Sequence, residues 1–133
     1  MAAPKADKAQ LDKFQKSYKD LQKLQGDSTE HKNATRQLEA QLNENTMVLN
    51  EINLIDGSDN IYKMVGPALI KQDLEEVKMN VKNRISHITG EVKRHEDADR
   101  KIEESRNEII MDMKKLEAQL MESMQKSGLV QKN

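Results

Sequence analysis

The stretch Leu54–Leu74, LIDGSDNIYKMVGPALIKQDL, decides the fold because it interrupts two long segments with helical patterning. At its start, the residues Gly57 to Asn60 are of types that end helices and form turns. The run Ile61–Val65 is short, β-branched and aromatic, as strands are. Gly66-Pro67 then favours a tight reversal, since Gly tolerates a positive φ and Pro fixes its own φ. The pattern predicts a helix, a β-hairpin and a second helix.

The residues after the reversal predict a return strand and then a new helix. Ala68–Lys71 would form the return strand. Asp73 is followed three residues later by Glu76, which is the spacing of an N-cap with a capping-box acid. The second helix is therefore expected to begin at about Leu74.

The predicted hairpin has more apolar surface than one chain can cover. A lone two-stranded hairpin is marginally stable in water and leaves two open edges. Its apolar residues also fall on both strand faces, so we expect the hairpin to join hairpins from other chains. The predicted assembly residues are Ile61, Tyr62, Met64, Val65, Gly66, Pro67, Leu69 and Ile70.

The same residues resemble a known family, the β-type subunits of prefoldin. The family's run has LDGS, a short strand, GP, an apolar pair and KQ. Here it is matched by Asp56-Gly57-Ser58, Ile61–Val65, Gly66-Pro67, Leu69-Ile70 and Lys71-Gln72. The likeness extends into the first helix through the residues LEAQLNEN at 38–45. It covers roughly two thirds of the chain at the level of pattern.

The resemblance implies both an architecture and a function. It implies a mainly α fold, a long antiparallel two-helix coiled coil with one β-hairpin between the helices, that assembles through the hairpin. It also implies a subunit of a hetero-hexamer of two α-type and four β-type chains. Such hexamers capture unfolded proteins, notably actin and tubulin, and transfer them without ATP to the group II chaperonin of the cytosol.

We expect residues 1–133 to form one domain of this type. The first helix would span about 8–56, the hairpin about 60–72 and the second helix about 73–127, with a disordered tail at 128–133.

The composition fits an elongated helical protein rather than an enzyme. Hydrophobic residues make up 35% and charged residues 34% of the 133 positions, and there are only three aromatic residues, which favours a thin seam over a thick core. The net charge of −1 comes from interspersed signs, so neither nucleic acid nor a membrane is an expected partner. There are no cysteines, no apolar signal-peptide core near Met1 and no apolar run of transmembrane length. A cytoplasmic location is predicted.

Heptad spacing predicts which residues line the seam between the helices. The first helix would begin its seam with Leu11, Phe14, Tyr18 and Leu21. A stammer near Leu24, with two consecutive steps of three, would then change the register. After it come Ser28, His31, Thr35, Leu38, Leu42, Asn45, Leu49 and Ile52. The second helix shows two unbroken columns: Leu74, Val81, Ile88, His95, Ile102, Ile109, Leu116 and Ser123, and Lys78, Ile85, Val92, Asp99, Arg106, Met113 and Leu120.

Polar seam residues are expected to meet between the helices. In an antiparallel helical hairpin reversed near Gly66, facing residue numbers should sum to about 125 to 130. Ser28 would then lie near Asp99, and His31 near His95. We interpret this layer as a device that sets register and orientation, with a ligand site as the less favoured alternative.

The helix ends away from the hairpin carry apolar residues outside the seam. Methionine is flexible and suits surfaces that accept unrelated apolar partners. We therefore predict a client-binding tip there, the alternative being a packing contact between helices. The predicted tip residues are Leu11, Phe14, Ile110, Met111, Met121 and Met124.

No catalytic, cofactor-binding or metal-binding residues are predicted. His95-Glu96-Asp97-Ala98-Asp99 has Asp99 where a zincin helix has its second histidine, so it is interpreted as a solvated helix turn. None of the glycines belongs to a phosphate-binding fingerprint. The alternative to a holdase is a structural tether or scaffold that binds defined folded partners. A β-forming hairpin argues against that alternative, because a plain helical hairpin needs only a polar loop.

Overall fold

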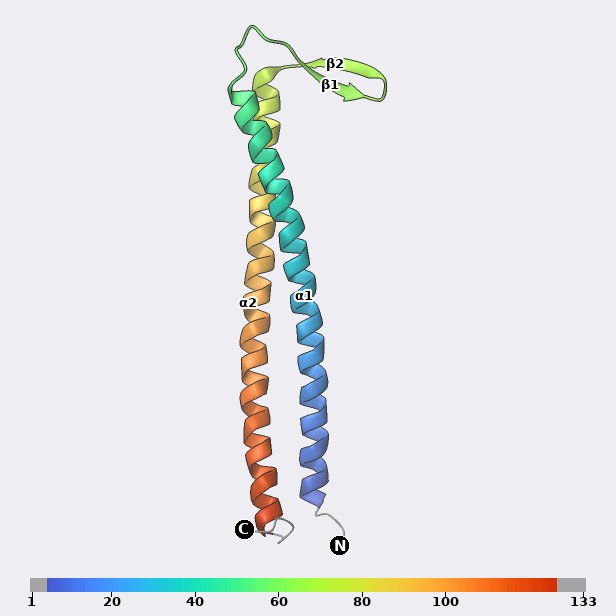
Figure 1. Cartoon of the computed structure of the whole chain (residues 1–133), viewed down its shortest axis with the longest axis vertical. Coiled ribbons are helices and arrows are strands. Elements are labelled where there is room, and N and C mark those ends of the chain that lie inside the picture. Colours follow the sequence, from blue (N-terminus) through green and yellow to red (C-terminus); the bar gives the residue numbers. More distant parts are fainter. Residues whose placement is uncertain (1–4, 127–133) are drawn as a thin grey trace. The chain divides into compact units, whose positions relative to one another are not determined.

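Two long helices and one antiparallel hairpin make up the described part of the chain, residues 5–126 of the computed structural model, with side chains described for 8–126. The order is α1 (Lys5–Asn53), β1 (Ile61–Val65), β2 (Ala68–Gln72) and α2 (Leu74–Lys126) (Figure 1). The predicted fold class, two long helices with a β-hairpin between them, is confirmed.

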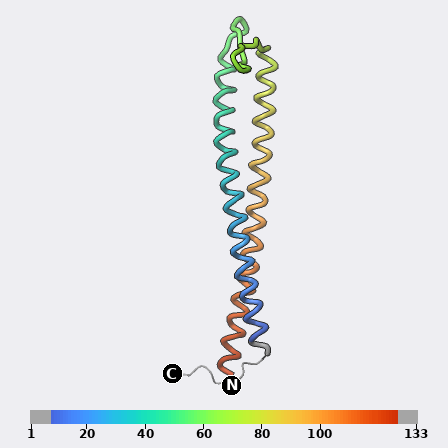
Figure 2. Tube along the Cα trace, turned by 90° about the vertical axis from the view of Figure 1, so that its right-hand side faces the viewer, coloured from blue at the N-terminus to red at the C-terminus, as the bar shows by residue number. Residues whose placement is uncertain are grey.

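The chain forms two compact units, and each helix contributes to both. The hairpin unit comprises residues 32–97, and the described part of the terminal unit comprises 5–31 and 98–126. Within the hairpin unit, the end of α1 and the start of α2 run antiparallel and side by side (Figures 1 and 2).

The hairpin closes through a two-residue turn. Met64 pairs with Leu69 and Val65 with Ala68, which leaves Gly66 and Pro67 as the loop. Gly66 has a φ of +59° at the first loop position, as type II′ hairpin turns require, and the glycine adopts it without steric cost. The strands extend to the pair of Ile61 with Gln72, one residue beyond the predicted return strand.

Helix α1 ends at Asn53, three residues before the predicted end at about Asp56. The N–H of Leu54 donates to the carbonyl of Glu51, and that of Ile55 to the carbonyl of Ile52. These bonds span three residues, so the helix tightens into a 3₁₀-like turn before Gly57 is reached. At the other end α1 begins at Lys5, three residues earlier than expected.

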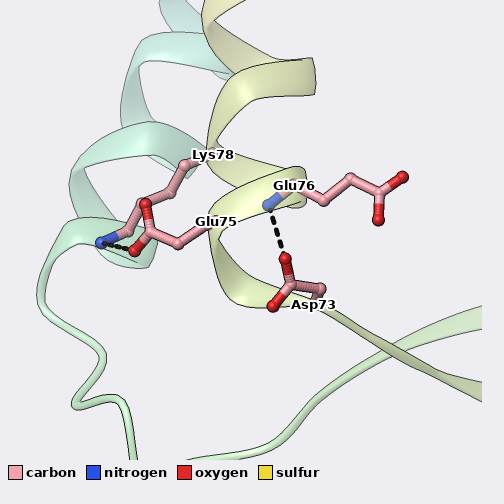
Figure 3. A network of polar contacts seen from close by, with 4 residues as sticks. All are labelled: Asp73, Glu75, Glu76 and Lys78. Carbon is pink, nitrogen blue, oxygen red and sulfur yellow. Dashed lines mark hydrogen bonds and ion pairs between the residues drawn. The ribbon is translucent and has the colours of Figure 1, made fainter.

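Helix α2 begins at Leu74, as predicted, because Asp73 caps it. The Asp73 carboxylate accepts a hydrogen bond of 3.2 Å from the Glu76 N–H, and the Asp73 carbonyl accepts the first helical bond from Val77 (Figure 3). The Glu76 side chain points away from Asp73 in Figure 3, so the capping box is only half formed. Glu75, in the first turn of α2, pairs with Lys78 at 3.7 Å. The predicted end near 127 and the tail at 128–133 lie outside the described residues.

The seam predicted for α2 is confirmed except at one position. Every predicted seam residue of α2 is buried or half-buried apart from Arg106, which is exposed. Val81 and Ile88 are the most covered, and each side chain contributes about 1.5–3 kcal/mol through burial. In α1 the seam from Leu21 to Ile52 is confirmed, and Ile52 is buried.

The predicted stammer near Leu24 is wrong. Leu11 and Tyr18 are 51% and 54% exposed, whereas Gln10 and Ser17 are half-buried. The covered positions therefore continue in strict alternation of four and three residues through 10, 14, 17, 21, 24 and 28. The first turns of α1 keep the register of the rest, with polar Gln10 and Ser17 on either side of Phe14 in the seam and with Leu11 and Tyr18 outside it.

Candidate assembly and client-binding surfaces

The outer face of the hairpin is an exposed apolar surface. Directly paired residues of antiparallel strands project to the same side, so Met64 and Leu69 share a face with the pair Tyr62 and Lys71. Met64 is 73% exposed and Leu69 is 65% exposed. Apolar residues at such exposure in paired strands are typical of a surface that contacts a partner.

The inner face of the hairpin borders a groove against the helices. The groove holds about 280 Å³ and includes Ile61, Lys63 and Gln72 from the hairpin, and Tyr62, which projects to the outer face, also borders it. Val48 and Ile52 of α1 and Val77, Asn80, Val81 and Arg84 of α2 line it as well. Ile61 is half-buried, so it takes part in the packing of this unit as well as in any assembly.

The structure brings all the predicted assembly residues onto one small sheet. Val65 and Ile70 share the face of Ile61 and are both about half exposed. Gly66 and Pro67 form the exposed loop between the strands. The helix residues of the groove were not predicted as site residues, and only packing of the hairpin against the helices reveals them.

The predicted tip residues belong to the terminal unit and differ in exposure. Leu11, Met111, Met121 and Met124 are exposed large apolar side chains. Phe14 and Ile110 are half-buried, and each lines a shallow hollow. Both hollows include Tyr18, which the sequence assigned to the seam. Continuing the alternation of four and three residues backward from Ser28 would have placed Tyr18 outside it.

One of the two contacts predicted for the polar layer, that of Ser28 with Asp99, is confirmed. The Ser28 hydroxyl donates a hydrogen bond of 2.6 Å to the Asp99 carboxylate, and Ser28 is buried. The residue numbers sum to 127, within the predicted range, so this pair fixes the antiparallel register of that unit. His31 and His95 are half-buried, and their predicted proximity stays a prediction.

The pKa shifts that are resolved among the described residues belong to one ion pair at the surface of α2. Arg94 donates a hydrogen bond of 2.7 Å to Glu91, and this bond lowers the pKa of Glu91 and raises the pKa of Arg94. Lowering the pKa makes the Glu91 carboxylate a weaker base, whereas a general base at neutral pH needs a raised pKa. The pair lies at the surface and contributes little to stability.

Residues 5–126 offer neither a candidate metal cluster nor a candidate membrane span. No group of His, Asp or Glu there gathers three side chains in a geometry that could hold a metal ion. Neither helix contains, within the same residues, a stretch long and apolar enough to span a membrane.

Two long helices joined by a small apolar sheet are the architecture to compare with known families. The model of the family described as "Prefoldin subunit" matches residues 8–127. The chain therefore belongs to the prefoldin subunit family, whose members are chaperone subunits rather than enzymes and have other prefoldin subunits as partners.

Within that family, the chain is similar to proteins named prefoldin subunit 6. Prefoldin subunit 6 of Mus musculus is 39% identical over 101 residues, which cover 73% of this chain and 80% of the mouse protein. Prefoldin subunit 6 of Arabidopsis thaliana is 38% identical over 101 residues, covering 76% of this chain and 78% of the plant protein. The hairpin motif resembles that of prefoldin subunit six, and these relatives confirm that resemblance.

A solved structure shows the same fold. The crystal structure of the prefoldin beta subunit from Thermococcus strain KS-1 matches with a TM-score of 0.61 and 18% identity. The match covers 86% of this chain and 94% of the archaeal one.

Proposed function

We propose that this chain is one β-type subunit of a hetero-hexameric, ATP-independent co-chaperone of the cytoplasm. The complex captures unfolded proteins such as actin and tubulin and transfers them to the group II chaperonin. In this proposal, residues 1–133 act as a single domain. The hairpin residues Ile61, Tyr62, Met64, Val65, Gly66, Pro67, Leu69 and Ile70 form the assembly surface. The client-binding tip consists of Leu11, Phe14, Ile110, Met111, Met121 and Met124.

One observation carries the assembly part of the proposal. The sheet has only two strands, and its outer face exposes Tyr62, Met64 and Leu69. Two open edges and an apolar face are satisfied when further strands are added, so hairpins of several subunits would share one sheet. A tether that binds folded partners would have no need of such a surface.

The exposed methionines of the terminal unit support the client-binding part. Met111, Met121 and Met124 lie at the surface of α2, where charged helix formers would be expected in a solvent-facing coiled coil. Many weak apolar contacts hold a non-native chain without chemistry, so no nucleotide is required.

Assembly is tested by co-expression with candidate α-type and β-type prefoldin subunits, followed by native mass spectrometry of what co-purifies. The expected mass is that of two α-type and four β-type chains. A chain that purifies alone or with itself, under conditions in which the other subunits assemble, would contradict the proposal.

Holding activity is tested on the same complex. Dilution of chemically denatured actin into buffer without nucleotide should give less light scattering when the complex is present. Later addition of the chaperonin with ATP should release folded actin. If actin aggregated at the same rate with and without the complex, the alternative function, a structural tether that binds folded partners, would be favoured.

A further inference from the structure

A second apolar stripe follows the flank of α1 in the terminal unit. Leu11, Phe14 and Tyr18 are spaced three and four residues apart, so they lie on one face of the helix. Leu11 and Tyr18 are exposed because Gln10 and Ser17 occupy the seam positions beside them. Leu11 and Tyr18 are therefore surface that the helix pair does not use, and half-buried Phe14 lies between them at the edge of the seam.

Two shallow hollows adjoin along this stripe. One of about 400 Å³ is lined by Phe14, Gln15, Tyr18, Lys19 and Gln22. The other, of about 330 Å³, is lined by Tyr18, Leu21, Gln22, Gln25, Arg106 and Ile110. Because Tyr18 and Gln22 belong to both, we treat the hollows as one surface, the flank groove.

The charged residues that line the flank groove are all positive. Its charged residues are Lys19 and Arg106, and no carboxylate is among the lining side chains. Within the described chain neither cation forms an ion pair. Arg106 occupies a seam position by spacing yet is exposed, so its guanidinium is available to a bound molecule.

We propose that the flank groove binds extended segments of unfolded proteins in which apolar side chains alternate with Asp or Glu. This inference rests on the proposed client-holding function and adds a class of segment to it. Apolar side chains fill the space beside Phe14, Tyr18 and Ile110, and the carboxylates of the segment pair with Lys19 and Arg106.

The glutamines of the groove suit an extended chain. Gln15, Gln22 and Gln25 each carry an amide that both donates and accepts hydrogen bonds. An unfolded segment offers unpaired backbone N–H and C=O groups, which these amides can satisfy without reading the side-chain sequence. Lysine-rich segments are disfavoured because Lys19 and Arg106 repel them.

The test compares three labelled synthetic peptides of equal length with the same leucine and phenylalanine positions. The remaining positions are Asp and Glu in the first, Asn and Gln in the second, and Lys in the third. Fluorescence anisotropy measures their binding to the assembled complex at low ionic strength. The acidic peptide should bind about tenfold more tightly than the lysine peptide, and added salt should reduce the difference.

Reversing the charge of the two groove cations tests whether the preference for the acidic peptide arises in this groove. The variant K19E/R106E should lose the preference for the acidic peptide, and K19Q/R106Q should reduce it partway. The control K16E/K115E changes the same charge at exposed residues outside both hollows and should keep it. An acidic preference that K19E/R106E and the control share equally would overturn the proposal.

Aggregation assays on the wild-type complex separate this inference from the function on which it rests. If the complex suppresses aggregation of denatured actin but binds the three peptides equally, the flank groove proposal fails and the holdase stands. If it does not suppress aggregation, the proposed function fails first.

Discussion

The hairpin unit and the terminal unit are built from the same two helices, yet they cover their side chains differently. The buried apolar residues of the described chain, Ile52, Val81 and Ile88, all lie in the hairpin unit. The buried residue of the terminal unit is polar Ser28, held by Asp99. The hairpin unit is thus stabilised by apolar packing, whereas the terminal unit uses a polar contact to fix its register.

Exposed apolar residues differ between the units in kind as well. The hairpin unit gathers Tyr62, Met64 and Leu69 on a sheet with fixed register, which suits partners of fixed structure. The terminal unit leaves Met111 and Met121 on a helix surface, where flexible side chains can adapt to varied partners. In the proposed function, one chain therefore supplies a specific surface for assembly and an adaptable surface for unfolded clients.

The largest expected effect is loss of assembly when the outer face of the hairpin is made acidic. The variant M64D/L69D places two carboxylates on paired, exposed positions, so it should leave the helices intact and prevent hairpins from sharing a sheet. Co-purification of the other subunits should be abolished. If this variant still formed the full complex, the outer face of the hairpin would not be the assembly surface.

The second effect is loss of client holding without loss of assembly. Replacing Ile110, Met111, Met121 and Met124 together by Gln should remove most of the suppression of aggregation by the complex, because the apolar contact area is removed. Subunit stoichiometry should not change, since the assembly surface belongs to the other unit.

The control for this variant is M47Q/M79Q, which changes two methionines of the hairpin unit that are about as exposed. It should keep full holding activity. Equal loss in both variants would mean that exposed methionine anywhere on the helices suffices.

The third effect concerns packing and compares matched isoleucines of α2. Ile88 is buried in the hairpin unit, whereas Ile102 is a half-buried seam residue of the terminal unit. I88A should lower the free energy of opening of α2 by about 2–4 kcal/mol, and I102A by about 1–2 kcal/mol. Amide exchange of α2 peptides in the assembled complex, followed by mass spectrometry, measures both. Equal losses would mean that the terminal unit is packed as tightly as the hairpin unit.

The fourth effect tests the polar contact of the terminal unit. S28A leaves the half-buried Asp99 carboxylate without its hydroxyl partner and should cost about 1–2 kcal/mol in the same exchange measurement. The double variant S28A/D99L removes both polar groups and should recover most of that loss. No recovery would indicate that the pair contributes attraction beyond satisfying a covered carboxylate.

The smallest expected effect is a gain in helix stability when one glycine in each unit is replaced by alanine. Gly26 of α1 and Gly90 of α2 are exposed within helices, and a Cβ added at either would meet no atom within 4 Å. G26A and G90A should each stabilise the local helix by about 0.5–1 kcal/mol, because alanine restricts the unfolded chain. The gain should slow amide exchange around each site. If only one substitution stabilised its helix, the alanine at the other site would have to be strained in a way that is particular to its unit.

The elements of this fold could be predicted because their signals are local. A β-branched run, a Gly-Pro reversal and an Asp cap specify the hairpin and the start of α2 through backbone conformations that depend on a few neighbouring residues. Heptad spacing specified the α2 seam for the same reason, since one helix face repeats regularly along the chain. The motif of the hairpin region indicates the family from the sequence alone, because its turn and strand residues are contiguous.

Tertiary structure decided what spacing alone left ambiguous. Leu11 and Tyr18 are apolar and follow heptad spacing with Phe14 and Leu21, which predicts them in the seam, but the register set by the Ser28–Asp99 contact turns Gln10 and Ser17 inward instead. The groove beneath the hairpin likewise depends on tertiary structure, because its lining joins Val48 of α1 to Ile61 of the hairpin and Val81 of α2, which are distant in the sequence. A residue's type and spacing determine which surface it can join, whereas the partner helix, through long-range contacts, determines which surface is covered.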